Sequence, residues 1–329
     1  MKIIDSVKNL DYSKSEALVK KHGPGIAANI FRYVFFLSLS YVLLYPFLFV
    51  VMNGIMGVTD SYDATVTWVP KEPTLQNIVN AWTVFKVGSA LPRTIIYEII
   101  TALIQFMSCA VAAYGMARYK FKGQSLLSLL MILNILVPSM MIIIPSFVQF
   151  TKLDFLGILG LVEKLTGADL RPNIVGTPLT FYLPGLMGVG LKGGLFIYIY
   201  TQFFKGLPKE LEEAAWIDGA GPWKTFLTIV LPSSGSAMIT VLIFSMIWHW
   251  NDVFLAQMYL EESTFATAIQ EFNQSSVVIG LSIDGGSAKL IEVQTLLSGC
   301  LMFLIPLIIF YLIVQRKFVA SIATSGIVG

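Results

Sequence analysis

The sequence predicts an all-α membrane protein with six transmembrane helices. Of its 329 residues, 56% are hydrophobic and only 13% are charged, whereas a soluble domain carries about 25% charged residues. The mean hydropathy of +0.74 agrees with a chain that is partly surrounded by lipid. The net charge is only +2 and the basic residues are spread along the chain, so we do not expect nucleic acid as a partner.

Six apolar stretches are long enough to cross a bilayer, because a spanning helix needs about 20 mostly apolar residues. They are residues 33–52, 94–117, 126–148, 183–204, 236–255 and 293–314. The fourth is the least regular, since it contains Lys192 and a cluster of glycines. The first begins too far into the chain, and is too long, for the core of a cleavable signal peptide, so we expect it to remain as a membrane helix.

Five prolines stand within or at the ends of these stretches, at positions 46, 138, 145, 184 and 306. Membrane helices tolerate proline where neighbouring helices satisfy the backbone groups that it frees. Each proline therefore predicts either a fixed kink or a moving hinge.

The distribution of Lys and Arg predicts that both termini are cytoplasmic. Positive residues concentrate beside the cytoplasmic ends of membrane helices, and more than half of the 22 basic residues fall in short segments on the side of the N-terminus. These residues are Lys2, Lys8, Lys14, Lys20, Lys21, Arg32, Arg118, Lys120, Lys122, Lys205, Lys209, Lys224, Arg316 and Lys317. The opposite segments, 53–93, 149–182 and 257–292, are longer than turns, and their apolar pieces predict short interfacial helices or a re-entrant segment.

The sequence contains no set of residues that predicts catalysis or metal binding. Cys109 and Cys300 lie in apolar stretches and are expected to be unpaired core residues. His22 and His249 each lack a second His or Cys nearby, so we expect no metal site. The chain is therefore expected to be neither an enzyme nor the holder of a cofactor.

A polar stretch, "ELEEAAWIDGAGPWKTFLTIVLP", separates the fourth and fifth spans at residues 210–232. Pro208 can occupy a first helical turn, the following carboxylates suit the positive end of a helix dipole, and Gly219 can end the helix in a left-handed conformation. The pattern predicts a helix of two to three turns and then a second short piece. One side of this helix carries Leu207, Leu211, Ala214 and Ala215. We expect this elbow to dock against another protein.

The same stretch resembles the EAA motif of binding-protein-dependent ABC importer permeases. The matching points are Glu213-Ala214-Ala215, Gly219, Ile229 and Leu231-Pro232. The resemblance implies a type I ABC importer permease bundle with a cytoplasmic coupling helix, here about residues 208–224, that sits in a cleft of the ATP-binding subunit. It assigns the coupling contacts to Glu210, Glu212, Glu213, Ala214, Ala215, Asp218 and Gly219.

Further stretches are similar to the carbohydrate branch of that family, and in particular to the smaller maltose-type permease subunit. They are "PTLQN" at 73–77, "AAYGMARYKFKG" at 112–123, "LPKELEEAAWIDGAG" at 207–221, "WND" at 250–252, and the tail pieces "QRKFV" and "GIVG". A longer outer segment around "GADLRPNIVGTPLTFY" and the tail "ASIATSGIVG" depart from the pattern and leave the particular solute open. The implied division is a cytoplasmic N-terminal segment (1–32), a first transmembrane helix with an extracytoplasmic segment (33–90), a permease core (91–314) and a cytoplasmic tail (315–329).

The energy source is expected to be a partner chain, because the sequence contains no G-x-x-x-x-G-K-[ST] phosphate-binding loop. The resemblance implies two ATP-binding subunits that hold ATP and Mg, a second permease chain that completes a heterodimer, and an extracytoplasmic solute-binding protein. It places the assembly in a bacterial-type plasma (inner) membrane. This chain would form half of the translocation path for a sugar or oligosaccharide.

Five residues are candidates for that path. Trp248, Trp250, Asn251 and Asp252 lie toward the outer end of the fifth span, where aromatic faces could stack on sugar rings. The same tryptophans suit an interfacial belt, and Asn251 and Asp252 equally suit a helix cap or a polar pair. Lys192 is the fifth candidate, because a charge within a span is costly and often functional. It either lines the path or pairs with Glu98 or Asp252.

Three other functions fit parts of the sequence. A permease of the same class could carry a non-sugar solute. An ion-coupled secondary transporter would usually show repeat symmetry and intramembrane acids, and the sequence shows no repeat. A structural or receptor-like subunit would leave the polar elbow without a role.

Overall fold

The computed structural model describes residues 25–154, 157–280 and 286–325. Within these residues the regular structure is helical, apart from the isolated bridges Met56–Pro73 and Gly176–Leu260. The prediction of an all-α protein is confirmed. Most of the predicted N-terminal segment 1–32, including His22, lies outside the described residues.

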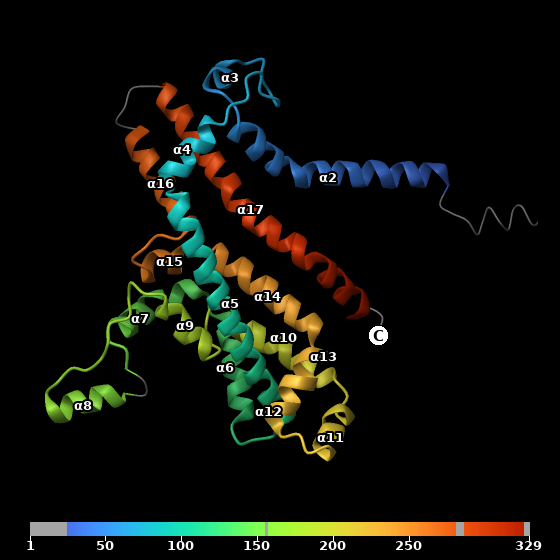
Figure 1. The fold of residues 1–329 in the computed structure, drawn as a ribbon, viewed down its shortest axis with the longest axis vertical. Coiled ribbons are helices and arrows are strands. Elements are labelled where there is room, and N and C mark those ends of the chain that lie inside the picture. The colour runs from blue at the N-terminus through green and yellow to red at the C-terminus, as the bar shows by residue number, and fades with distance from the viewer. Residues whose placement is uncertain (1–24, 155–156, 281–285, 326–329) are drawn as a thin grey trace, which may run out of the picture.

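Three long helices correspond to the first, second and sixth predicted spans. They are α2 (Ile26–Gly54), α5 (Val87–Arg118) and α17 (Gly286–Ser325). Each contains an apolar stretch long enough to cross a membrane, at 28–54, 87–118 and 293–316. α5 runs through the body from α4 (Gln76–Val84) at one end to the neighbourhood of α11 (Glu210–Ile217) at the other (Figure 1).

The third predicted span is bent rather than straight. α6 (Gln124–Leu136) meets α7 (Ser139–Thr151) at 108°, with Pro138 between them. The residue before a proline is pushed out of the helical conformation, which accounts for this corner. The fifth predicted span, 236–255, coincides with α14 (Gly235–Trp250) over most of its length, but α14 ends at Trp250, before the predicted end. α14 meets the segment before it, which consists of α12 (Pro222–Thr225), the π-helix η1 (Phe226–Val230) and α13 (Leu231–Ser233), at 80°. The described helices thus provide three spans, or up to five when each bent pair counts as one.

The prediction of a continuous fourth span over 183–204 is wrong. The structure divides this stretch into α9 (Leu179–Leu186) and α10 (Gly193–Gly206). Gly188 and Lys192 have φ angles of 74° and 60°, and left-handed residues cannot continue a right-handed helix. Lys192 consequently lies in a break between two helices and not within a helical turn. The sixth span, in contrast, extends beyond the predicted 293–314 at both ends.

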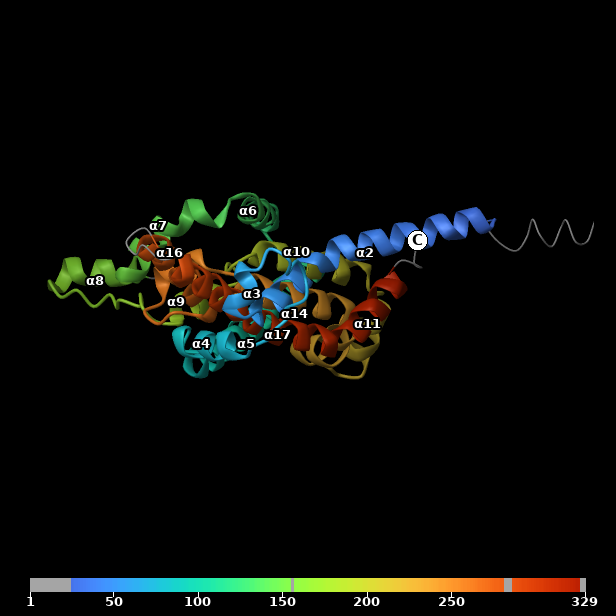
Figure 2. The ribbon, with the colours of Figure 1, turned by 90° about the horizontal axis from the view of Figure 1, so that it is seen from above.

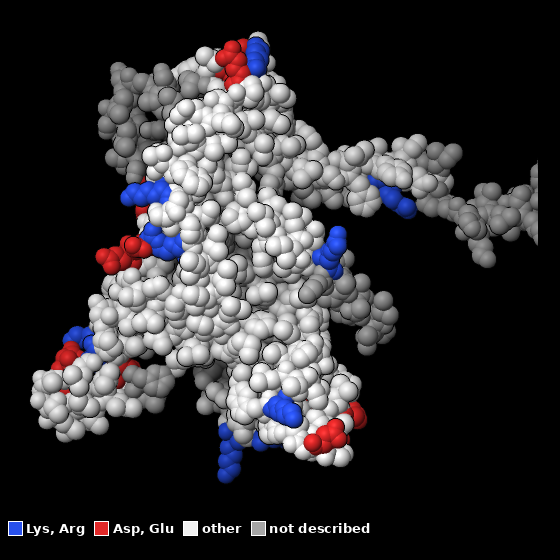
Figure 3. Space-filling view, viewed as in Figure 1, with Lys and Arg blue, Asp and Glu red and all other residues white. Residues whose placement is uncertain are grey.

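Short helices form much of the segments that were predicted to lie outside. They are α3 (Val58–Tyr62), α8 (Ile158–Thr166), α15 (Phe254–Tyr259) and α16 (Phe265–Gly280). α8 covers most of the apolar piece predicted as a short helix, and it projects from the body on the side opposite α2 (Figures 1 and 2). The face shown in Figure 3 is uncharged over most of its area, and its acidic and basic side chains lie in small groups at the periphery, one of them at the end where α11 lies.

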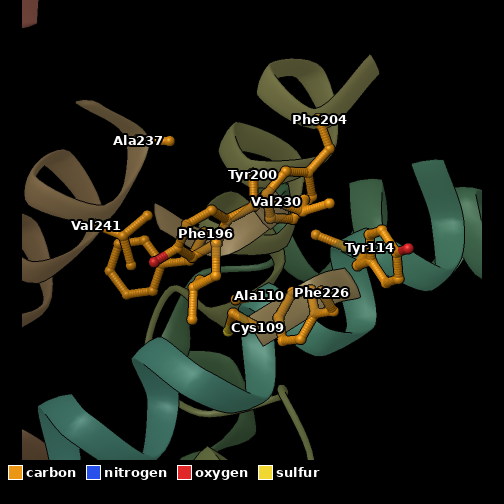
Figure 4. Close-up of a cluster of buried hydrophobic side chains, with 12 residues drawn as sticks. Cys109, Ala110, Tyr114, Phe196, Tyr200, Phe204, Phe226, Val230, Ala237 and Val241 are labelled. Atoms are coloured by element: carbon orange, nitrogen blue, oxygen red, sulfur yellow. The ribbon is translucent and has the colours of Figure 1, made fainter. Parts of the chain in front are cut away.

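The main core lies where α5, α10 and α14 meet near that end. Its largest members are Tyr200, Phe196, Phe204 and Phe226, all almost fully buried (Figure 4). The rings of Tyr200 and Phe204 stack with their centroids 5.6 Å apart. Aromatic side chains contribute much of the energy of a packed core, so this cluster fixes α10 against α5 and α14.

α6 is held close to α10 by a glycine contact. The amide N–H of Gly194 donates a hydrogen bond of 2.9 Å to Oδ1 of Asn134. A Cβ atom at Gly194 would lie 2.7 Å from that oxygen and 2.8 Å from the carbonyl oxygen of Met131. Small residues allow membrane helices to approach this closely.

Gly194→Ala should therefore destabilise the bundle by about 1–3 kcal/mol, the usual cost of inserting a methyl group into a packed site. The measurement is the midpoint of thermal unfolding of the purified protein in detergent. Gly206→Ala is the matched control, because a Cβ atom there meets nothing within 4 Å. An unchanged midpoint for Gly194→Ala would show that α6 and α10 are not held as described.

Candidate functional site

The polar elbow consists of two short helices joined by a glycine turn. α11 spans eight residues, which is about 12 Å at 1.5 Å per residue. Gly219 has a φ angle of 78°, and the amides of Gly219 and Ala220 donate to the carbonyls of Trp216 and Ala215 at 3.0 and 2.9 Å. The prediction that Gly219 ends the helix in a left-handed conformation is confirmed.

The residues assigned to coupling divide between two faces of the elbow. Five of them are exposed: Glu210, Glu213, Ala214, Asp218 and Gly219. Glu212 and Ala215 are buried against the bundle. The shared face predicted for Leu207, Leu211, Ala214 and Ala215 is not formed, because Leu211 and Ala214 are exposed while Ala215 is buried. The sequence pattern identified the helix correctly but not its orientation.

The exposed face also carries large apolar side chains, of which the sequence analysis had named only Leu211. Ile217 is 86% exposed and Trp223 is 64% exposed, and Leu211 and Trp216 are each about half exposed. Large apolar side chains that gather in this way on a polar segment mark an interaction site. The sequence did contain a signal for this apolar surface: large apolar residues stand among acids in a stretch that is too polar to lie in lipid.

The buried face is tied to the end of α5 by an ion pair. Nε of Arg118 lies 2.5 Å from Oε1 of Glu212, and the two side chains are 6% and 4% exposed. The hydroxyl of Tyr114 donates to Oε2 of Glu212 at 2.9 Å, and Nη2 of Arg118 donates to the carbonyl of Leu207 at 3.0 Å. Glu212, expected to contact a partner, therefore faces inward and bonds to its own bundle.

A pocket of about 100 Å³ lies between the bent pair α6 and α7, the break between α9 and α10, and the helices α14 and α15. Its polar wall includes Asn134, Ser146, Thr180, Lys192 and His249. Among the described residues that line it there is no carboxylate. Polar groups of this kind, placed beside aromatic side chains such as Tyr259, can bind the hydroxyl groups of a solute.

Lys192 lies at this pocket without an acidic partner among the described residues. Its Nζ stands over the ring of Trp248, 5.8 Å from the centroid, a cation–π distance. Neither Glu98 nor Asp252, the two partners considered from the sequence, forms a salt bridge with it in the described part of the chain.

The other candidates for the path have structural contacts. Trp250 is buried against Phe303, with ring centroids 5.2 Å apart. The side-chain amide of Asn251 donates to the carbonyl of Ile247 at 2.8 Å. Oδ1 of Asp252 accepts the amide N–H of Leu255 at 3.2 Å, which caps the start of α15. Trp248 and Asp252 thus contact residues of the pocket wall, Lys192 and Leu255, whereas Trp250 and Asn251 contact Phe303 and Ile247, which do not line the pocket.

The break that carries Lys192 is held by polar side chains of α5, which the sequence analysis also missed. Nε2 of Gln105 donates to the carbonyl of Leu191 at 2.7 Å, and Oε1 of Gln105 accepts the hydroxyl of Ser245 at 3.1 Å. The hydroxyl of Ser108 donates to the carbonyl of Gly185 at 2.5 Å. The signal in the sequence was polar residues inside an otherwise apolar span.

Ion pairs stabilise the loops that follow α3 and α8. Hydrogen bonds from Arg171 and Lys152 hold the pKa of Asp169 well below its usual value. Lys71 and Thr65 likewise lower the pKa of Asp63. These pairs are exposed and stabilise loop conformations. No group of three or more His, Cys, Asp or Glu residues in the described ranges could hold a metal ion.

Comparison with known proteins identifies the family to which this chain belongs. A family model described as "Binding-protein-dependent transport system inner membrane component" matches residues 106–324. Because the match covers more than half of the chain, this protein belongs to that family. It is a multi-pass permease subunit and not an enzyme, since ATP hydrolysis in such transporters takes place on separate subunits.

Curated relatives are similar over most of their length. The chain is 26% identical to the diacetylchitobiose uptake system permease protein NgcG of Streptomyces coelicolor over 86% of this chain and 84% of the relative. It is 29% identical to the trehalose transport system permease protein SugB of Mycobacterium tuberculosis over 74% and 77%. A solved bacterial ABC transporter involved in the import of the acidic polysaccharide alginate has the same fold, with a TM-score of 0.67, 18% identity, and coverage of 90% of this chain and 99% of that chain.

Replacing Gln105 by Leu should loosen the break between α9 and α10. The substitution leaves the carbonyl of Leu191 and the hydroxyl of Ser245 without this partner, and each unsatisfied buried group costs about 1–3 kcal/mol. We expect a lower unfolding midpoint in detergent and faster protease cleavage between α9 and α10. Gln202→Leu is the control, because Gln202 is exposed on α10. Equal midpoints for the two variants would contradict the role given to Gln105.

Proposed function

We propose that this chain forms half of the translocation path of an ATP-driven importer of a sugar or oligosaccharide, and that α11 is the coupling helix. The observation that carries the proposal is the two-sided elbow. Its inner face is bonded to α5, and its outer face presents acids and large apolar side chains to a partner. Such a face would bury well in the cleft of an ATP-binding subunit.

The docking residues in this proposal are Glu210, Glu213, Asp218 and Ile217, with Trp216 and Trp223 as the apolar anchors. Aromatic residues buried at the centre of an interface contribute most of its energy. The π-helix η1 and α13 join the elbow directly to α14. A displacement of α11 would therefore reach both α10, which precedes the elbow, and α14, which follows it.

The proposed mechanism is alternating access. When ATP closes a pair of ATP-binding subunits, the coupling helices of two permease chains are drawn together, and rigid helices convert this shift into opening toward the outside. Hydrolysis resets the bundle and the solute leaves inward. An extracytoplasmic solute-binding protein delivers the solute, and both termini of this chain face the cytoplasm.

A carbohydrate is the proposed solute because relatives named for diacetylchitobiose, trehalose and melibiose, raffinose and stachyose are similar over most of this chain. The pocket wall, with Asn134, Ser146, Lys192 and the aromatic Tyr259 and Trp248 nearby, suits hydroxylated rings. The test is uptake of radiolabelled trehalose, melibiose and raffinose into proteoliposomes that contain the complete complex, its solute-binding protein and internal ATP. Uptake of none of these sugars, together with uptake of an amino acid or of any solute driven by a proton gradient without ATP, would contradict the proposal.

Ile217→Asp should release the ATP-binding subunit. A charge in place of the most exposed apolar residue of the elbow would be desolvated at the interface, so we expect at least a tenfold loss of ATP-binding subunit that copurifies with the permease, about 1.4 kcal/mol or more. Leu161→Asp on α8 is the control, since it places the same charge at an exposed apolar position far from α11. Copurification at the wild-type level would rule out docking through this face.

Gly219→Val should uncouple ATP hydrolysis from transport. Valine is strained at a φ angle of 78°, so the turn between α11 and α12 must change its shape while the bundle, which contacts nothing at this position, stays folded. We expect ATPase activity to persist and sugar uptake to fall. Gly206→Ala again serves as the control. Normal uptake at a normal ATP cost would argue against coupling through this turn.

A further inference from the structure

Arg118 is bonded to both ends of the segment that leads into the elbow. Its guanidinium donates to the carbonyl of Leu207, the residue that ends α10, and pairs with Glu212 in the first turn of α11. The contact with Leu207 is a hydrogen bond, and the contact with Glu212 is an ion pair. One side chain at the end of α5 therefore sets the angle between α10 and α11.

Tyr114 supports the same carboxylate from the core. Its ring packs against Phe226 at 5.0 Å and against Phe204 at 6.1 Å between centroids, and its hydroxyl donates to Glu212. Figure 4 shows the ring at the edge of the aromatic cluster with its hydroxyl directed away from it. The carboxylate of Glu212 is thus held on both oxygens by consecutive turns of α5.

The ion pair costs desolvation energy, which apolar side chains at the same positions would avoid. A buried pair adds little net stability compared with such a replacement, but the loss of one partner leaves an uncompensated charge and is strongly destabilising. Such a pair therefore strongly disfavours any separation of α11 from α5. An exposed pair would allow that separation at almost no cost.

α5 also makes a contact at the pocket, through Gln105. Gln105 is 13 residues before Arg118 on the same helix, about 20 Å away at 1.5 Å per residue. It holds the carbonyl of Leu191, next to Lys192 in the pocket wall. α5 is continuous between the two positions.

We propose that Arg118 and Glu212, with Tyr114, are positioning residues that make α11, the end of α10 and α5 move as one body, so that displacement of the elbow reaches the pocket through α5. This inference rests on the proposed function of α11. It assigns to Glu212 a role opposite to that of its neighbours: Glu210 and Glu213 meet the partner, and Glu212 transmits the motion inward.

The first experiment separates transmission from docking. Glu212→Gln, Arg118→Gln and Tyr114→Phe are each assembled into the complete complex and reconstituted with the solute-binding protein. Sugar uptake and ATPase activity are then measured in the same vesicles. We expect the first two variants to retain the ATP-binding subunit and its ATPase activity but to lose about tenfold in solute transported per ATP, a typical size for coupling between sites. Tyr114→Phe, which removes only a hydroxyl, should lose less, in the same direction.

Glu72→Gln is the charge control for this series. It removes the same charge at an exposed position outside the elbow, and should leave the transport per ATP unchanged. The exchange Arg118→Glu with Glu212→Arg should restore part of the ratio lost in either charge variant. Wild-type ratios for Glu212→Gln and Arg118→Gln would overturn the proposal.

A distance measurement decides the case in which a charge variant fails to assemble. Spin labels at the exposed positions Lys120 and Lys209 report the separation between the end of α5 and the start of α11, in a background with Cys109 and Cys300 replaced by alanine. In the wild-type complex we expect one narrow distance that does not change when ATP is added, and a broadened distribution in Tyr114→Phe. A separation that changes with ATP in the wild type would show that α11 moves relative to α5 and would overturn the inference. Failure of the wild-type chain to bind the ATP-binding subunit would instead refute the proposed function.

Discussion

The bonding of the backbone inside the membrane is the constraint on which this structure depends. No water is available there to satisfy a free N–H or C=O group, so a spanning segment must remain helical or obtain partners from its neighbours. The break between α9 and α10 obtains them from α5 and α6. Gln105, Ser108 and Asn134 bond to Leu191, Gly185 and Gly194. These hydrogen bonds satisfy the backbone groups of the break, so that it can depart from helical geometry beside the pocket, where Lys192 lies.

Under the proposed function the elbow satisfies a different constraint, because it has to be held rigidly against the bundle and to bind another chain. The eight residues of α11 provide both properties, because buried and exposed side chains alternate along the helix. Glu212 is bonded to α5 and Ala215 is buried, whereas Glu213, Trp216 and Ile217 are exposed. The family match implies partner chains that bind nucleotide and solute, and the exposed face is where the first of them can bind without disturbing the core.

The fold class, the positions of the long spans and the elbow could be predicted from the sequence because each depends on local pattern. Apolar length determined α2, α5 and α17, and the proline, acids and glycine around α11 determined where that helix lies. The division of the fourth span could not be predicted, since it depends on left-handed residues, including Lys192, whose cost is offset by contacts from α5. The inward orientation of Glu212 could not be predicted either, because it depends on Arg118, which lies more than 90 residues earlier in the chain.

Under the proposed function, two properties suit a path that this chain shares with a second permease chain. The first is α2, whose apolar stretch is 0% buried within the structure, so that its surface is left to lipid or to another subunit. The second is the pocket, whose volume of about 100 Å³ is smaller than the roughly 300–1,000 Å³ of ligand pockets. In the proposed function, a sugar would therefore occupy space that opens between this chain and a second permease chain. The choice of solute then depends on both walls, and the contribution of this chain is a wall with one cation and no carboxylate among its described residues.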